Sequence, residues 1–165
     1  MCGGVKYTDQ QNKAWTVYFP SPKAALPVIK KSGEIEWVTW GKRKEENVPY
    51  FPNGGWARLD SIKEGKWQRH LPTPVLLPVQ AFMEKDHEKV SHWFDMKQDE
   101  VIQGLLTVHN DTARVYVVTT DTPPEFSYIH DRWPRIIHRH QNSESISHDS
   151  YVSLQSIPRI SGSIG

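Results

Sequence analysis

The sequence predicts a single α+β domain, in which a mixed, mostly antiparallel sheet or a barrel-like core carries short flanking helices. Short apolar stretches with strand character recur along the chain between Pro, Gly and Asn-Asp turn signals. Helical spacing occurs in only two places. A length of 165 residues and a hydrophobic fraction of 37% are typical of one domain that buries its own core.

The expected strands are joined by recognisable turns. A Pro-Ser-Pro sequence ends the first strand, the turn 30–33 joins the second to the third, and Asn110-Asp111 predicts a hairpin between the last two. The predicted strands are 14–19, 26–29, 34–40, 75–83, 92–96, 105–109 and 113–119.

Two helices are expected between and after these strands. Residues 56–66 place apolar side chains at helical spacing after a Gly pair. Thr122 is the expected N-cap of the second helix, because two prolines follow it in the first turn. This helix should direct Phe126 and Ile129 inward and end near residues 130–132.

Composition restricts the partners of the chain. A net charge of +1 is too low for a protein that coats DNA, although a small basic groove is compatible with it. We find neither a membrane-spanning apolar run nor a signal peptide, and therefore expect a cytoplasmic protein. The single cysteine excludes an internal disulfide and a cysteine-based zinc knuckle. His138 and His140 lack acidic or thiol companions at ligand spacing, so we expect no metal and no cofactor.

Cys2 is the first candidate for chemistry. The initiator methionine is normally removed before a residue as small as cysteine, and Gly3 and Gly4 leave this end accessible. The product carries an α-amine and a thiol on adjacent carbons, with ordinary pKa values of about 8 and 8.5. Such an aminothiol converts an aldehyde to an imine and then to a thiazolidine. The alternatives are an N-terminal nucleophile for hydrolysis and a terminal cysteine without a role.

Glu84 and His130 are the next candidates. Glu84 ends the apolar run 79–83, where partial burial would raise the pKa of its carboxyl into the range of a general acid or base. An exposed residue of a charged turn is the alternative. His130 lies at the expected end of the second helix, where interaction with the helix dipole is an alternative to a role in chemistry. We expect both side chains to face Cys2 across one pocket.

Several stretches occur in a fixed order along the chain. They are Met1-Cys2-Gly3, Trp40-Gly41, Ala57-Arg58, PVLLPVQAFMEK ending shortly after Glu84, Gly104-Leu105-Leu106 and VVTTDTPPEFSYIHDRWPRII. In this order they resemble the SOS response-associated peptidase (SRAP) family, which includes 5-hydroxymethylcytosine-binding and abasic-site-processing proteins. The last block is the most specific. We therefore expect a SRAP-like domain over 1–137 and a divergent, loosely ordered segment over 138–165.

The resemblance implies a DNA-repair protein that links itself covalently to abasic sites in single-stranded DNA. Cys2 would form the thiazolidine with the ring-opened sugar, Glu84 would handle protons at the α-amine, and His130 would protonate the sugar oxygen. The family also implies autoproteolytic removal of the initiator methionine. A monomer that joins the nucleoid when DNA is damaged is the expected form. The implied DNA contacts are Arg58, Arg132 and Trp40.

Two positions depart from the family pattern. Trp56 stands where the family has a catalytic asparagine, for which Asn53 is a speculative substitute, and Gly4 stands where an arginine is usual. Two further functions therefore stay open. One is an N-terminal-nucleophile peptidase or amidase that uses Cys2, and the other is a DNA-binding module whose catalysis is impaired by Trp56.

Overall fold

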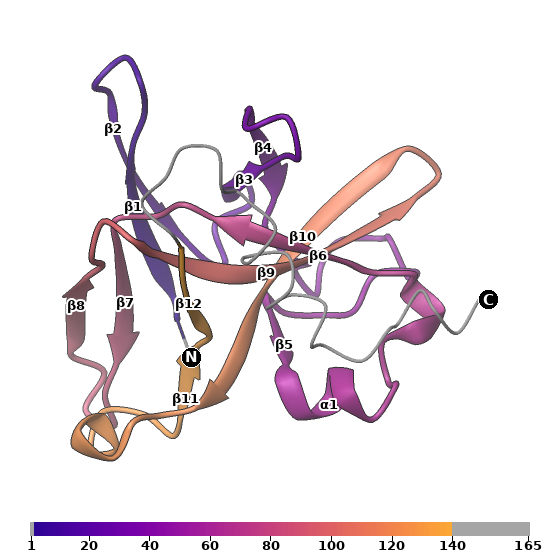
Figure 1. Cartoon of the computed structure of the whole chain (residues 1–165). Coiled ribbons are helices and arrows are strands. Elements are labelled where there is room, and N and C mark those ends of the chain that lie inside the picture. Colours follow the sequence, from indigo (N-terminus) through magenta and orange to yellow (C-terminus); the bar gives the residue numbers. More distant parts are fainter. Residues whose placement is uncertain (1, 140–165) are drawn as a thin grey trace.

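The computed structural model describes residues 2–139, which form two β-sheets with a shared core (Figure 1). The smaller sheet has the strand order β2-β1-β7-β8, and all its pairs are antiparallel. Its strands are β1 (Gly4–Thr8), β2 (Ala14–Tyr18), β7 (Ala81–Lys85) and β8 (Ser91–Asp95).

The larger sheet has the order β11-β10-β9-β6-β3-β4, with β12 added on β9 and β5 on β10. Only the pair of β5 with β10 is parallel among its described strand pairs. Its strands are β3 (Ala25–Ile29), β4 (Ile35–Thr39), β5 (Trp56–Arg58), β6 (Thr73–Leu77), β9 (Glu100–His109), β10 (Thr112–Asp121), β11 (Arg132–Pro134) and β12 (Ile136–His138).

Apolar residues from both sheets meet in one cluster. Val5 and Phe82 come from the smaller sheet, and Leu26, Ile102 and Val117 come from the larger one. Each of these side chains is at most 2% exposed. Removal of this apolar surface from water is the main stabilising contribution to the fold. Each sheet therefore buries its apolar face against the other sheet.

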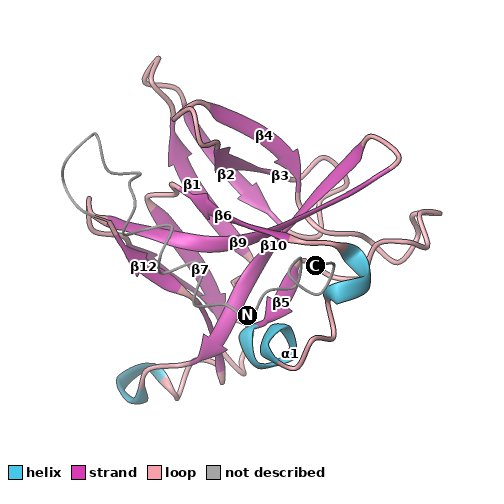
Figure 2. Ribbon diagram, turned by 45° about the vertical axis from the view of Figure 1, so that its right-hand side comes forward, coloured by secondary structure: helices cyan, strands magenta, loops and turns pink. Residues whose placement is uncertain are grey.

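The mixed, mostly antiparallel sheet of the predicted fold class is confirmed, but the α+β description overstates the helices. The helical elements are α1 (Leu59–Lys63) and two single 3-10 turns, η1 (Gln68–His70) and η2 (Pro124–Phe126). Figure 2 shows that they lie at the periphery of a fold made of strands. The described strands form two sheets and no closed barrel.

The helix predicted over 56–66 is wrong in its first part. Residues 56–58 pair in parallel with Val117–Thr119 of β10, and only the following five residues are helical. Burial of Ala57 against the larger sheet outweighs the local spacing, since sheet pairing satisfies the same backbone groups.

The strand predicted over 75–83 is also wrong, because it is two strands in different sheets. Pro78 has no backbone N–H, and the chain crosses from β6 to β7 at residues 78–80. As a result Glu84 lies inside β7 and not after the end of a strand.

The second predicted helix is reduced to the 3-10 turn η2, and Thr122 is not its N-cap. Pro123 precedes the turn, and no side chain caps it. Ile129 is buried as predicted, whereas Phe126 is half-buried and stacks on Trp133. The hairpin at Asn110-Asp111 is confirmed, with both residues at positive φ. The segment predicted over 138–165 begins with the last residue of β12, and residues 140–165 lie outside the described part.

Candidate active site

Cys2 enters the core directly before β1. Gly3 donates its N–H to the carbonyl of Met83 at 2.9 Å, so β7 holds the start of the chain against the smaller sheet. Cys2 is fully buried in the apolar cluster between the sheets. Its Sγ lies 3.4 Å from the carbonyl of Gly4. Burial, and secondly the charge of Glu84, raise the pKa of the Cys2 thiol to about 12, which keeps it protonated at neutral pH.

Glu84 is a buried carboxyl group within electrostatic range of Cys2. It follows Phe82 by two positions on β7, so both side chains point to the inner face of the sheet, and Glu84 has no exposed surface. Burial raises the pKa of Glu84 to about 7. A group with this pKa can release and accept a proton at neutral pH, as the predicted role requires.

His130 lies in a pocket of about 470 Å³ whose lining includes Gly3 and Met83, the chain neighbours of Cys2 and Glu84. Its Nδ1 accepts the backbone N–H of Arg132 at 3.0 Å, which leaves Nε2 to carry the proton of the neutral ring. Burial lowers the pKa of His130 and favours this neutral form, although Asp131 opposes the shift. We refer to this cavity as the His130 pocket.

Cys2 and Glu84 lie within electrostatic range of each other, and the pocket that contains His130 is lined by their chain neighbours Gly3 and Met83. His130 lines the His130 pocket, whereas Cys2 and Glu84 are fully buried and do not line it. The prediction that all three side chains face one another across an open pocket stays a prediction in this state of the chain.

Trp56 connects the site with the larger sheet. Its indole N–H donates to the carbonyl of Cys2 at 2.6 Å, and its ring packs on Phe19 with centroids 4.9 Å apart. Trp56 also lines the His130 pocket. The tryptophan at the expected asparagine position thus retains a donor toward the N-terminal residue. Asn53 is exposed and does not line this pocket.

A side chain at Gly4 would be crowded by Tyr18. The ring of Tyr18 lies against it, and a Cβ at this position would stand 3.0 Å from a ring carbon of Tyr18. Tyr18 and Lys85 are functional candidates that the sequence did not identify, because they line the His130 pocket from β2 and β7. The alternation of β2, which exposes Tyr18 beside half-buried Val17, is the signal that could have identified the tyrosine.

Of the three expected DNA contacts, the prediction for Trp40 is wrong, Arg132 is bound to other residues of the chain and Arg58 is accessible. Trp40 is fully buried and donates its N–H to Gly55, so its prediction as a DNA-binding residue is wrong. The guanidinium of Arg132 is buried and donates to the carbonyl of Thr119 and to Asp121, both at 2.9 Å. The exposed Arg58 is paired with Asp60 at 2.7 Å. Of these three residues, only Arg58 is positioned to reach a phosphate without leaving a buried partner.

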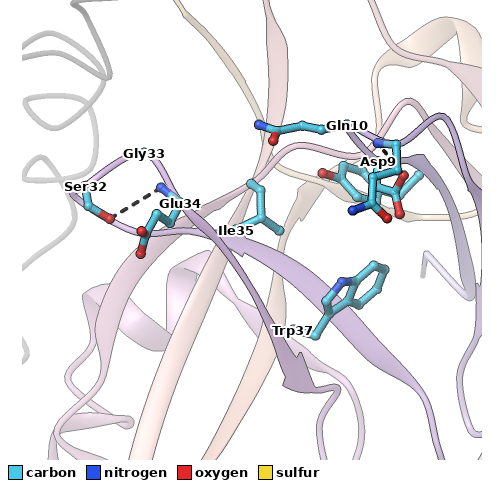
Figure 3. Close-up of a pocket in the computed structure, with 9 residues that line it drawn as sticks. Asp9, Gln10, Ser32, Gly33, Glu34, Ile35 and Trp37 are labelled. Atoms are coloured by element: carbon cyan, nitrogen blue, oxygen red, sulfur yellow. Dashed lines mark hydrogen bonds between the residues drawn. The ribbon is translucent and has the colours of Figure 1, made fainter.

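A further cavity of about 680 Å³ lies at the turns that follow β1 and β3 (Figure 3). Figure 3 shows Asp9 and Gln10 on one side and Ser32, Gly33 and Glu34 on the other, with Ile35 between the two groups and Trp37 below them in this view. None of the predicted site residues lines it, and it shares no lining residue with the His130 pocket.

Among residues 2–139, no group of three or more His, Cys, Asp or Glu side chains could hold a metal ion. The described part of the chain also contains no helix with the length and apolar character needed to cross a membrane. No protein-family model matches this chain, and a search of curated proteins finds no match.

Proposed function

We propose that this protein forms a covalent crosslink with abasic sites in single-stranded DNA through the N-terminal aminothiol of Cys2. The observation that supports the proposal is the buried pair of Cys2 and Glu84. A carboxyl group with a pKa of about 7 lies in electrostatic contact with the one residue whose amine and thiol can trap an aldehyde. His130 adds a neutral imidazole at the adjoining pocket.

The first chemical step produces the aminothiol. Hydrolysis of the Met1–Cys2 peptide bond consumes one water molecule and releases methionine, which leaves a free α-amine on Cys2. Intact mass measurement of the untagged protein should show a chain shorter by this residue. A mature chain that keeps Met1 would lack the proposed nucleophile.

The crosslink itself requires no oxidant or reductant. The α-amine adds to the aldehyde of the ring-opened sugar, and loss of water gives an imine. Sγ then bonds to the imine carbon, while the thiol proton is transferred to the nitrogen, and a five-membered thiazolidine results. Glu84 is suited to carry protons to and from the amine, because its pKa of about 7 allows both directions. His130 is suited to donate the Nε2 proton to the sugar oxygen during ring opening.

Access to Cys2 is a condition of this chemistry. The thiol is fully buried and its pKa is raised to about 12, so it cannot initiate the attack as a thiolate. The amine therefore reacts first, and ring closure uses the neutral thiol. The proposal requires that loss of Met1 opens a path from the His130 pocket to Cys2.

The deciding experiment is incubation with an oligonucleotide that contains one abasic site, followed by a denaturing gel. We expect a denaturation-resistant product with the natural sequence and none with Cys2→Ala. Cys2→Ser keeps the amine and should give at most a reversible imine, because a hydroxyl closes the ring poorly. Equal product from natural protein and Cys2→Ala would refute the proposal, and DNA affinity without product would identify an impaired binding module.

A further inference from the structure

A third cavity, of about 970 Å³, adjoins the His130 pocket. Phe19, Pro20 and Trp56 line both of these cavities, so the two meet at these three residues. The remainder of the third cavity is formed largely by residues 42–46, which follow β4. We refer to it as the Arg43 cavity.

Arg43 is one of the lining residues of this cavity, and the fold fixes its guanidinium in place without saturating its donors. Nε donates to the carbonyl of Pro20 at 3.2 Å, and the guanidinium lies 5.0 Å from the centre of the Phe19 ring. The side chain is only 5% exposed. Within the described part of the chain, Nη1 and Nη2 are buried and lack a hydrogen-bond partner. Buried donors without partners cost about 1–3 kcal/mol each, and more when charged, so this arrangement favours a ligand that accepts from them.

Glu46 does not remove the positive charge of the cavity. It lies 3.6 Å from Nη1 of Arg43, but both of its oxygens also accept from Nη1 of Arg114 at 3.1 Å. One carboxylate is thus shared between two guanidinium groups. Lys42 and Lys44 line the same cavity. The single additional acid in the lining, Glu45, leaves a cationic excess.

We propose that the Arg43 cavity binds a phosphate group, with Arg43 as the bidentate donor and Lys42 and Lys44 beside it. A guanidinium presents two parallel N–H donors that match two oxygens of a phosphate. Two sources can supply this chemistry. One is a backbone phosphate of the strand whose abasic site occupies the His130 pocket, and this source rests on the proposed function. The other is a free phosphate ion.

The test measures binding without crosslinking. The probes are a short single strand that lacks an abasic site and inorganic phosphate alone, each titrated against natural protein, Arg43→Gln and Arg69→Ala. Arg69 is an exposed arginine that lines neither cavity, and its variant is the matched control for loss of one positive charge. Anisotropy over a range of salt concentrations gives the DNA affinity and its salt dependence, and calorimetry gives the phosphate affinity.

For a backbone phosphate, Arg43→Gln should weaken DNA binding by about tenfold or more and lower the salt slope by roughly 0.7, while Arg69→Ala changes neither. If only inorganic phosphate distinguishes Arg43→Gln from natural protein, the cavity holds a free phosphate ion. If neither probe distinguishes them, the inference is overturned. Since the strand has no abasic site, each of these results is independent of whether Cys2 forms a crosslink.

Misfolding of Arg43→Gln would obscure this comparison, so Lys44→Ala serves as a second variant. Lys44 is exposed and makes none of the contacts that hold the loop. It should lower the affinity for the responding probe about threefold with an unchanged melting temperature. An unaffected affinity in Lys44→Ala, together with an unfolded Arg43→Gln, would count against the site.

Discussion

At the scale of single residues, Trp56 has two separable contacts. Its indole N–H holds the main chain of Cys2, and its ring fills the space beside Phe19 and Trp40. Because a hydrogen bond and a packing contact respond to different substitutions, the contribution of each to the site can be measured separately.

Trp56→Phe should slow crosslinking by roughly 2- to 10-fold and lower the melting temperature by only a few degrees. Phenylalanine keeps an aromatic ring against Phe19 but lacks the N–H, and one hydrogen bond contributes about 0.5–1.5 kcal/mol. Single-turnover kinetics at saturating abasic DNA measure the effect. The matched control is Trp15→Phe, since the N–H of Trp15 donates to Asp9 at the turn after β1 and away from the site.

Trp56→Asn tests whether the tryptophan impairs the site or supports it. Asparagine is the residue that the proposed resemblance would place here, but it cannot fill the contact with Phe19 and Trp40, so we expect the variant to lose about 3 kcal/mol of unfolding free energy. Faster crosslinking by a Trp56→Asn protein of natural stability would show that the tryptophan impairs the site and does not support it.

Glu84 should make the stability of the protein depend on pH. The pKa of its carboxyl is raised from 4.5 to about 7 by burial, so the folded state binds a proton that the unfolded state releases. The resulting stability is fully present below about pH 4.5 and is lost as the pH rises through 7. Relative to Glu84→Gln, the natural protein should lose up to roughly 3 kcal/mol across this window.

Chemical denaturation at a series of pH values measures this difference. Taking the difference between the two proteins cancels the titration of all other groups that the substitution does not disturb. Parallel curves between pH 4.5 and 7.5 would mean that Glu84 titrates normally, and the proton-carrying role assigned to it would lose its basis.

At the scale of elements, the segment between β4 and β5 is fixed by close backbone contact. Gly41 has a φ of +58°, and a Cβ at this position would lie 2.1 Å from the carbonyl oxygen of Gly54. Lys42 and Gly54 exchange both of their backbone hydrogen bonds at 2.9 Å. The position of Arg43 in its cavity therefore depends on the absence of a side chain at residue 41.

Gly41→Ala should destabilise the protein by more than Gly54→Ala does. Both residues have positive φ, so each substitution costs about 1–2 kcal/mol in backbone strain. At Gly54 the nearest atom to an added Cβ is 3.7 Å away, whereas at Gly41 the added carbon collides with backbone. Equal unfolding free energies for the two variants in urea would contradict this account of the segment.

The strands differ in how far the sequence could predict them. Alternation and turn residues identified β2, β3, β4, β8 and β10 to within about two residues, and the second half of β9, because these segments carry their own signals. The short strands β1, β5, β11 and β12 were not predicted. Residues 56–58 show why, since their strand conformation comes from pairing with β10 and not from their own pattern.

The members of the candidate site were selected by resemblance and stay a prediction, whereas the full burial of two of them is observed. A resemblance in motif order selected Cys2, Glu84 and His130, yet no local pattern indicates that Cys2 and Glu84 are covered. Their burial follows from the register of β1 on β7, in which Gly4 pairs with Met83. Trp40 was assigned to DNA for a similar reason, because its spacing does not reveal the N–H that it donates to Gly55.

At the scale of the whole molecule, the single cysteine is a reporter of the fold. Cys2 lies in the one apolar cluster to which both sheets contribute, so a reagent can reach its thiol only when the sheets separate or the start of the chain detaches. Thiol labelling under native conditions distinguishes these two events, because only the first exposes enough surface to depend strongly on urea.

With Met1 in place, as verified by intact mass, we expect Cys2 to react with iodoacetamide only through unfolding. The raised pKa of about 12 reduces the thiolate fraction by roughly 1,000-fold or more, and burial blocks the remainder. The free energy obtained from labelling should match that from denaturation. A chain that begins at Cys2 should label faster, at a rate insensitive to urea, if loss of Met1 opens the site. Slow, urea-dependent labelling in both forms would mean that DNA cannot reach the thiol in the folded protein, and the crosslinking proposal would fail on access, whatever the chemistry of its residues.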